Sequence, residues 1–303
     1  MREMNTRAQM KTALGIALCL VGSLSAAAAS SESGEHIPPS AWSSRIFALA
    51  DAELDDGDAS YAISSVAFTA QHRHWSLGVE RQHFAWRNGE DFPSVVNGQE
   101  PWEFLNRIQL GYAHKHVHSD RWTSEIMVGG VAGFEDEMRN SFSGYAGGYG
   151  LYRVNPDLMC VIGFLFSKHQ KVATDLDNLP IVGVLWSPTA LQGFSAQLGF
   201  PKTHACWAIN ARNRLLLELN TLEGGVVRLA DDSPVQEKGY VEFTSAALTL
   251  RLETRVGENL DLSVGVGHSV HREMKVFDTD GKRQQSIDVE RGPSIEIGIS
   301  KPF

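Results

Sequence analysis

Apolar and polar residues alternate with a period of two in many segments of this chain. Segment 259–271 shows it best, because Leu260, Leu262, Val264 and Val266 alternate with Asp261, Ser263, Gly265 and Gly267. Segments 246–255, 214–220 and 107–112 repeat the pattern. Alternation is typical of a β-strand whose two faces meet different surroundings, whereas a helix would mix both kinds of residue on one face. The pattern therefore predicts strands.

The polar face of these segments carries charges as well as small residues. Arg251 and Glu253 stand between leucines, and Arg107 and Glu218 stand in the same way between apolar residues of other segments. A strand of a membrane barrel is apolar toward lipid and polar toward the lumen. A wet or side-chain-filled lumen also accepts small and charged residues together. We therefore predict an all-β fold, an antiparallel transmembrane β-barrel of the outer-membrane type.

Short and long connections alternate between the predicted strands. Tight-turn signals occur near 71–72, 119–120, 155–157, 187–188, 212–213 and 257–258. Longer or more polar links occupy 54–58, 87–101, 134–141, 168–178, 230–238 and 276–286, and a short link at Pro201 falls where a long one is expected. Periplasmic turns and outer loops alternate in this way. The pattern predicts about fourteen strands, with twelve as the alternative, and both chain ends on the periplasmic side.

The first 29 residues have the three parts of a secretory signal. A basic start is followed by the apolar run 12–24 and by small residues up to Ala29. The apolar run is shorter than the roughly 20 residues of a spanning helix. We expect cleavage after Ala29, a periplasmic lead-in over 30–43 and the barrel over 44–303, with its first strand near 44–53.

The last predicted strand carries the most specific local signal. Ile295, Ile297 and Ile299 lie on one face, and the chain stops in phase with them at Phe303. A terminal aromatic residue after alternating apolar residues resembles the assembly signal of bacterial outer-membrane barrels. Together with the secretory signal, it predicts recognition by the barrel-assembly machinery and export to the cell outer membrane. The expected partners there are outer-membrane lipids and lipopolysaccharide.

Four motifs carry a resemblance to a known family. They are Asn155-Pro156-Asp157-Leu158, Leu179-Pro180-Ile181-Val182-Gly183, Trp186-Ser187-Pro188 and Leu198-Gly199-Phe200-Pro201. The segment 155–300 resembles a family of functionally uncharacterised bacterial outer-membrane β-barrel domains, and the N-terminal half resembles it loosely. The resemblance implies a fold and a location but no catalytic residues. Pro180 and Pro201 fall at strand ends, where a missing backbone donor is tolerated.

Charge and cysteine content narrow the possible functions. The formal net charge of −9 argues against nucleic-acid binding, which needs a basic face. Cys160 and Cys206 are the two cysteines beyond the signal, too few for a disulfide framework, and we expect them to be ordinary apolar residues. We expect no cofactor.

The leading functional hypothesis is a passive channel or conduit for small polar solutes. Barrels of about eight strands fill with side chains and those of about sixteen leave open water, so fourteen strands lie between these cases. Charged residues on the predicted inner face are the candidate lumen lining: Glu80, Arg107, Glu125, Glu218, Arg251 and Glu253.

Two alternatives come from other functional classes. Ser269, His271 and Glu273 are spaced two residues apart, which would place them on one lumen-facing side of a strand. A serine nucleophile needs a histidine base within hydrogen-bond reach, so the first alternative is an outer-membrane lipid hydrolase that uses Ser269 and His271. The long link 87–101 instead favours a closed structural or adhesion barrel.

Histidines and tryptophans gather near the predicted strand ends. His114, His116 and His118 alternate on one segment, and His72 and His74 lie at the preceding turn, so all five are expected at the periplasmic rim. Imidazoles bind zinc, copper or nickel. Same-face neighbours on a strand are ~7 Å apart, however, which is too far for them to chelate one ion without help from another strand. We therefore interpret these histidines as interfacial residues and expect no metal site. We expect an interfacial girdle of Trp75, Trp86, Trp102, Trp122, Trp186 and Trp207.

Overall fold

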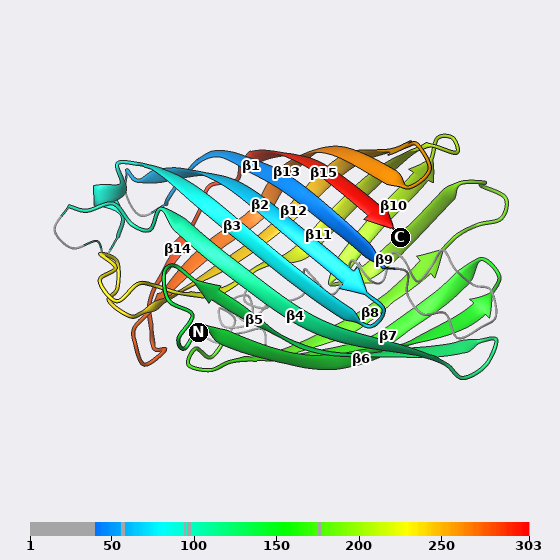
Figure 1. Ribbon diagram of the computed structural model, residues 1–303, viewed down its shortest axis with the longest axis horizontal. Helices are drawn as coiled ribbons and strands as arrows, with labels where there is room; N and C mark the ends of the chain where they lie inside the picture. Colours follow the sequence, from blue (N-terminus) through cyan, green and yellow to red (C-terminus); the bar gives the residue numbers. More distant parts are fainter. Residues whose placement is uncertain (1–39, 56–57, 94, 96–97, 175–176, 303) are drawn as a thin grey trace, which may run out of the picture.

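The computed structural model describes residues 40–302 except 56–57, 94, 96–97 and 175–176, and of 222–223 only the backbone. The predicted signal sequence, most of the predicted lead-in and Phe303 lie outside the described residues. The described part contains one short 3₁₀ helix, η2 (Gly89–Asp91), and fifteen strands (Figure 1): β1 Ala41–Glu53, β2 Ser60–His72, β3 Trp75–Arg87, β4 Phe104–Val117, β5 Trp122–Phe134, β6 Phe142–Asn155, β7 Leu158–His169, β8 Asn178–Trp186, β9 Phe194–Phe200, β10 Lys202–Ala208, β11 Asn213–Arg228, β12 Tyr240–Val256, β13 Leu260–Phe277, β14 Arg283–Asp288 and β15 Pro293–Pro302.

The strands close into one antiparallel ring. Each strand from β1 to β13 pairs with the next, and β15 pairs with both β13 and β1. β14 and β15 pair with successive parts of β13, at 273–277 and at 261–268, so together they act as one interrupted last strand. The ring therefore has fourteen strands, as predicted.

Two predicted boundaries differ from the structure. β1 begins at Ala41 rather than 44, because Ala41, Trp42 and Ser43 pair with β15 on one side and β2 on the other. The predicted link 276–286 contains the end of β13 and most of β14. The remaining short turns and long loops alternate as predicted, which gives the barrel a turn end and a loop end.

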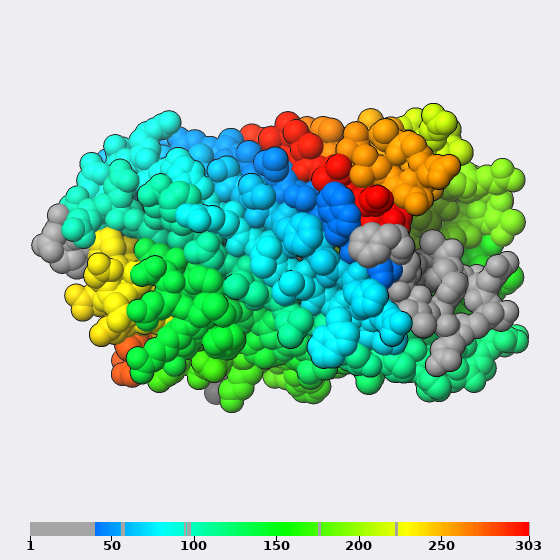
Figure 2. All heavy atoms as spheres, in the orientation of Figure 1, coloured from blue at the N-terminus to red at the C-terminus, as the bar shows by residue number. Residues whose placement is uncertain are grey.

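The outer surface of the barrel is apolar. Alternate residues along the strands are exposed and hydrophobic, including Val66, Leu77, Leu110, Ile126, Ile162, Val182, Leu217, Leu250, Val264 and Ile297. Seen from one side, β1 to β5 form a continuous wall (Figure 2). Such a belt matches hydrocarbon rather than water. Separately, the described part of the chain contains no helix with the length and apolar character that a membrane span requires.

The barrel changes shape toward the loop end. β9 and β10 meet at Pro201, whereas β11 continues for eight residues beyond Asn220, its last pairing with β10. β11 is irregular between Asn220 and Glu223, and Gly224 and Gly225 follow with φ of 142° and 152°. A Cβ on Gly224 would lie 1.9 Å from the Phe243 carbonyl oxygen, so a larger residue does not fit. Beyond this point β11 reaches across to β5, pairing Arg228 with Phe134.

A compact apolar cluster fills the loop end between β11–β14 and β1–β4. We call it the loop-end cluster; its buried members are Ala52, Leu54, Ala59, Tyr61, Phe84, Phe92, Trp102, Leu105, Val227, Leu229, Val235, Val241, Met274, Val276, Ile287 and Val289. The predicted girdle is therefore wrong for Trp86 and Trp102, which lie in or against this cluster, because Trp86 shares the inner face of β3 with Phe84. Trp75, Trp122, Trp186 and Trp207 are exposed at the turn end, as a girdle requires.

The two faces of β2 allow a direct test of the membrane orientation. Val66 points outward near the middle of the strand and is 57% exposed, whereas Ala67 faces inward opposite Glu80. We expect Val66→Arg to lower the free energy of unfolding by about 2–4 kcal/mol, because it places a charge in hydrocarbon. Ala67→Arg should cost much less. Urea titration of both variants in lipid vesicles measures the difference, and equal losses would contradict the orientation.

Candidate functional site in the barrel lumen

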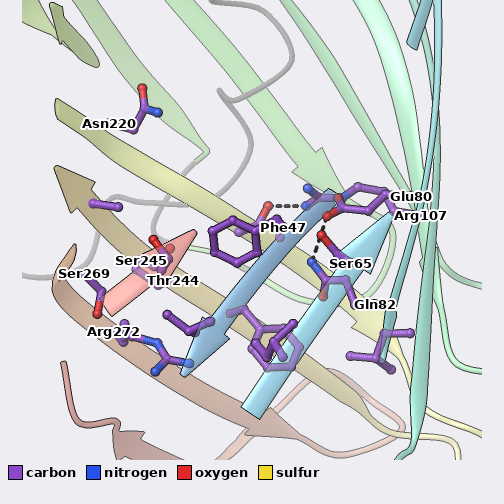
Figure 3. Close-up of a pocket in the computed structure, with 18 of the residues that line it drawn as sticks. Phe47, Ser65, Glu80, Gln82, Arg107, Asn220, Thr244, Ser245, Ser269 and Arg272 are labelled. Atoms are coloured by element: carbon purple, nitrogen blue, oxygen red, sulfur yellow. Dashed lines mark hydrogen bonds between the residues drawn. The ribbon is translucent and has the colours of Figure 1, made fainter. Parts of the chain in front are cut away.

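A cavity of about 160 Å³ lies inside the barrel below the loop-end cluster. We call it the charged chamber. Inner faces of β1–β4, β11–β13 and β15 line it, and Figure 3 shows side chains from these strands pointing into it. Among the lining residues are Arg45, Glu80, Arg107, Arg251, Arg272 and Glu296, together with hydroxyl and amide side chains such as Ser65, Gln82 and Thr249.

Glu296 is the centre of an ion-pair network on one wall of the chamber. Its carboxylate contacts the Arg251 guanidinium and lies 3.7 Å from Nη1 of Arg45. Arg251 in turn lies 3.9 Å from Glu253, which also contacts Arg214. These side chains come from β1, β11, β12 and β15. The network therefore connects the first and last strands of the barrel to β11 and β12.

A second ion pair lies on the inner face of β10 and β11. Lys202 bonds Glu218, and their side chains are only 11% and 6% exposed. Asn220 Nδ2 donates a second hydrogen bond to Glu218 at 2.7 Å. Buried charges of this kind require partners, because desolvation of an isolated ion costs several kcal/mol.

Arg107 holds the bend of β11. It stands opposite Glu80 in the pairing of β3 with β4, and its guanidinium donates a hydrogen bond to the carbonyl oxygen of Gly224 (Figure 3). Gln82 donates to Glu80 at 3.2 Å. Arg107 therefore connects the chamber wall to the strand that crosses the lumen.

The lining changes from charged to aromatic toward the loop end. Along the inner face of β3, Glu80 and Gln82 are followed by Phe84 and Trp86. Arg272 marks the boundary, since it donates to the Tyr61 hydroxyl at 2.8 Å and lies over that ring. A solute moving from chamber to loop end would thus meet polar groups first and packed aromatic rings second.

The structure brings together most of the predicted lumen residues. Glu80, Arg107 and Arg251 line the chamber, and Glu218 and Glu253 lie on the adjoining inner faces. Glu125 is buried elsewhere, opposite Tyr149 on β5 and β6.

The sequence analysis did not identify Arg45, Glu296 and Lys202 as lumen residues. The sequence does indicate that Glu296 faces the lumen, because it alternates with Ile295 and Ile297. It gives no indication that Lys202 pairs with Glu218, because this contact depends on the register between β10 and β11.

The inner face of β5–β8 differs from the polar lining that we expected. Its buried residues form a second apolar cluster, the inner-wall cluster: Met127, Tyr145, Tyr149, Leu151, Val161, Leu165, Leu179, Ile181 and Leu185. The expected alternation of polar inner and apolar outer residues is therefore wrong for most of this part of the wall, whose inner face is mainly apolar, with Glu125, Ser143 and Ser167 as buried polar residues.

The expected shared face of Ser269, His271 and Glu273 is also wrong. The register shifts at Val270, so Ala247 pairs with Ser269 while Ala246 pairs with His271. This bulge reverses the alternation, and Arg272 rather than His271 follows Ser269 into the chamber. The Ser269 hydroxyl is buried. It accepts a hydrogen bond from the Gly292 N–H at 2.8 Å and donates one to the Gly292 carbonyl at 3.2 Å. This arrangement lacks the serine–histidine contact of a hydrolase.

The histidines form two ring pairs at the turn end. The rings of His74 and His114 are 5.1 Å apart, and those of His116 and His118 are 4.5 Å apart. Within the described residues, no three potential ligands are grouped closely enough to hold a metal ion. Cys160 and Cys206 are unbridged and half-buried.

These features define a membrane-spanning antiparallel barrel of fourteen strands with a charged chamber inside it. No family model matches the chain, and no curated protein matches it. Among solved structures, it is similar to the KdgM porin, with 10% identity over 86% of this chain and 99% of that chain and a TM-score of 0.38. It is also similar to the Pseudomonas putida toluene transporter TodX, with 10% identity over 96% of both chains and a TM-score of 0.33.

The Lys202–Glu218 pair gives a test of the inner-face geometry. We expect Lys202→Met to lower the free energy of unfolding by about 3–5 kcal/mol, because the buried Glu218 carboxylate would lose its ion pair and keep the hydrogen bond from Asn220. Adding Glu218→Gln should restore most of that loss. A double-mutant cycle by urea titration measures the coupling, and additive losses would show that the pair does not form.

Proposed function

We propose that the protein is an outer-membrane channel for small polar solutes, with the charged chamber as its selective section. The observation that supports this most directly is the chamber itself, a solvent-sized space lined by charged, hydroxyl and amide groups within an apolar outer belt. Hydrocarbon outside and polar groups inside are the arrangement that a polar pathway through a membrane requires.

The loop-end cluster would be the narrowest section of this pathway. Trp102, from the β3–β4 loop, is 1% exposed, and its ring centroid lies about 6 Å from those of Phe84, Trp86 and Phe243. Conduction would then require displacement of this cluster. We expect a small conductance rather than that of a wide, open barrel.

The location and partners belong to the same proposal. An even number of strands with short turns at one end and longer loops at the other is typical of barrels in the outer membrane. The belt would contact outer-membrane lipids, the loops would lie beside lipopolysaccharide, and Phe303 would serve assembly. Membership of the uncharacterised barrel family is likewise proposed, on its motifs.

A closed structural barrel is the second candidate. The loop-end cluster supports it, because the described loop end is packed with apolar side chains and part of the β3–β4 loop lies within that packing. The two candidates differ in whether the cluster ever opens.

Conductance in planar bilayers separates these two functions. We expect small single-channel currents from the purified protein and larger currents from Trp102→Ala, because the variant removes a ring from the narrowest section. Trp75→Ala, which changes an exposed ring of the girdle, is the matched control. Absence of current from all three proteins would favour the closed barrel.

Ion selectivity tests the chamber separately. Glu296→Gln leaves Arg45 and Arg251 without their shared carboxylate, so the chamber gains positive charge and the channel should shift toward anions. Arg251→Gln should shift it toward cations. Reversal potentials in a KCl gradient measure both shifts, and unchanged potentials would place the ion path elsewhere.

A further inference from the structure

Most charged groups of the chamber are held by partners within the protein. The Arg107 guanidinium donates a hydrogen bond to the Gly224 carbonyl. Arg272 donates one to the Tyr61 hydroxyl at 2.8 Å and another to the Glu290 carbonyl at 3.2 Å. These two cations therefore serve the fold, because a solute would have to compete with contacts that they already make.

The same holds for three further charges. Glu273 accepts a hydrogen bond from the Ser286 hydroxyl at 2.6 Å and lies 3.5 Å from Nζ of Lys275. Arg251 and Glu296 bond each other, and their side chains are 20% and 9% exposed. A buried pair of this kind is already neutralised and has little exposed surface for a solute to contact.

Arg45 and Glu80 are the chamber charges with the fewest partners. Arg45 lies 3.7 Å from Glu296, which it shares with Arg251, and its side chain is 37% exposed. Among the described residues, Glu80 accepts one hydrogen bond, from the Gln82 amide at 3.2 Å, and forms no ion pair. One cation and one anion of the chamber lining are therefore available to a solute.

These two residues lie on one row of the inner wall. Arg45 of β1 pairs with Ala67 of β2, and Ala67 pairs with Glu80 of β3. Neighbouring strands lie ~4.8 Å apart, so the Cα atoms of Arg45 and Glu80 are separated by roughly 10 Å. Side chains stand nearly perpendicular to a sheet. The row therefore presents opposite charges on either side of a small methyl side chain.

The spacing of this row suits a solute that carries both charges. A carboxylate on Arg45 and an ammonium group on Glu80 would each form a charge-assisted hydrogen bond of ~2.8 Å. In an α-amino acid one carbon atom separates the two groups, so the molecule and its two hydrogen bonds span a distance similar to that between the strands. A simple anion or a simple cation would satisfy only one side.

The chamber is apolar on the loop side of the row. Phe47 follows Arg45 on the same face of β1, and Leu49 and Ile63 pair with each other beyond it. Figure 3 shows Phe47 projecting into the chamber. An aliphatic side chain directed toward this end would meet carbon atoms rather than charges, which favours its transfer from water.

We propose that the charged chamber binds an aliphatic amino acid as a zwitterion, with its carboxylate on Arg45, its ammonium group on Glu80 and its side chain against Phe47. The inference rests on the proposed function, because solutes must reach the chamber, and it names the class of solute. A solute that lacks either charge leaves a charged group of the protein unpaired, which is the strongest source of discrimination between similar ligands.

Equilibrium binding to the purified protein in detergent micelles tests the site without measuring conduction. The probe is radiolabelled leucine. Its competitors are isocaproate, which lacks the ammonium group, and isoamylamine, which lacks the carboxylate. We expect each competitor to bind about ten-fold more weakly than leucine or worse, because one charge-assisted hydrogen bond is lost.

Two substitutions should each affect a different competitor. Arg45→Gln should weaken leucine and isocaproate binding about ten-fold without weakening that of isoamylamine. Glu80→Gln should weaken leucine and isoamylamine binding without weakening that of isocaproate. Arg121→Gln and Glu258→Gln, at exposed residues of the β4–β5 and β12–β13 turns, are the matched controls and should change neither.

Leucine binding that is absent, or no tighter than that of either analogue, would overturn the proposal. So would a loss of all three ligands in both variants, because it would mean that the two charges act only through the fold. The outcome is distinct from that of the channel hypothesis. Binding without current in planar bilayers would keep the site and remove the channel, whereas current without binding would do the reverse.

Discussion

The structure depends on one constraint: each backbone N–H and carbonyl group in the membrane needs a hydrogen-bond partner within the protein, because hydrocarbon offers none. A strand edge in hydrocarbon leaves N–H and carbonyl groups unpaired, so a sheet that crosses a membrane must close. Here closure occurs between β15 and β1, nine residue pairs long, and the Arg45–Glu296 ion pair lies across the same seam. The alternating apolar pattern follows from that closure, because each strand then has one face toward lipid and one inside.

The departures from a regular ring all lie toward the loop end and are linked. β9 and β10 stop at Pro201, so β11 loses its neighbour and bends inward at Gly224 and Gly225 to reach β5. That bend brings Val227 and Leu229 into the loop-end cluster and places the Gly224 carbonyl on Arg107. The short hairpin of β9 and β10 is therefore linked to the narrowing of the lumen at the loop end.

The interior of the barrel has two linings of different polarity. The charged chamber presents four Arg and three Glu side chains together with hydroxyl groups, whereas the inner-wall cluster presents mainly leucine, isoleucine and tyrosine. The strand β11 bends into the lumen at the loop end, where it pairs with β5 at Arg228 and Phe134. The proposed polar solute would meet the charged lining of the chamber.

The sequence by itself predicted the membrane barrel, about fourteen strands and six charged lumen residues, five of which lie in or beside the chamber. It could do so because alternation is a local property: Arg251 between leucines must face away from them in any strand. Even so, the position of Trp86 and Trp102 near strand ends misplaced both in the interfacial girdle, since proximity to a strand end does not report which side chains pack inside the loop end.

Only the tertiary structure decided the features that depend on register and on strand length. The bulge at Val270 turned His271 away from Ser269, and the pairing of Lys202 with Glu218 required β10 and β11 to align. Such features are set by which residues lie opposite one another across the ring, and a period of two along one strand carries no information about the neighbouring strand's offset.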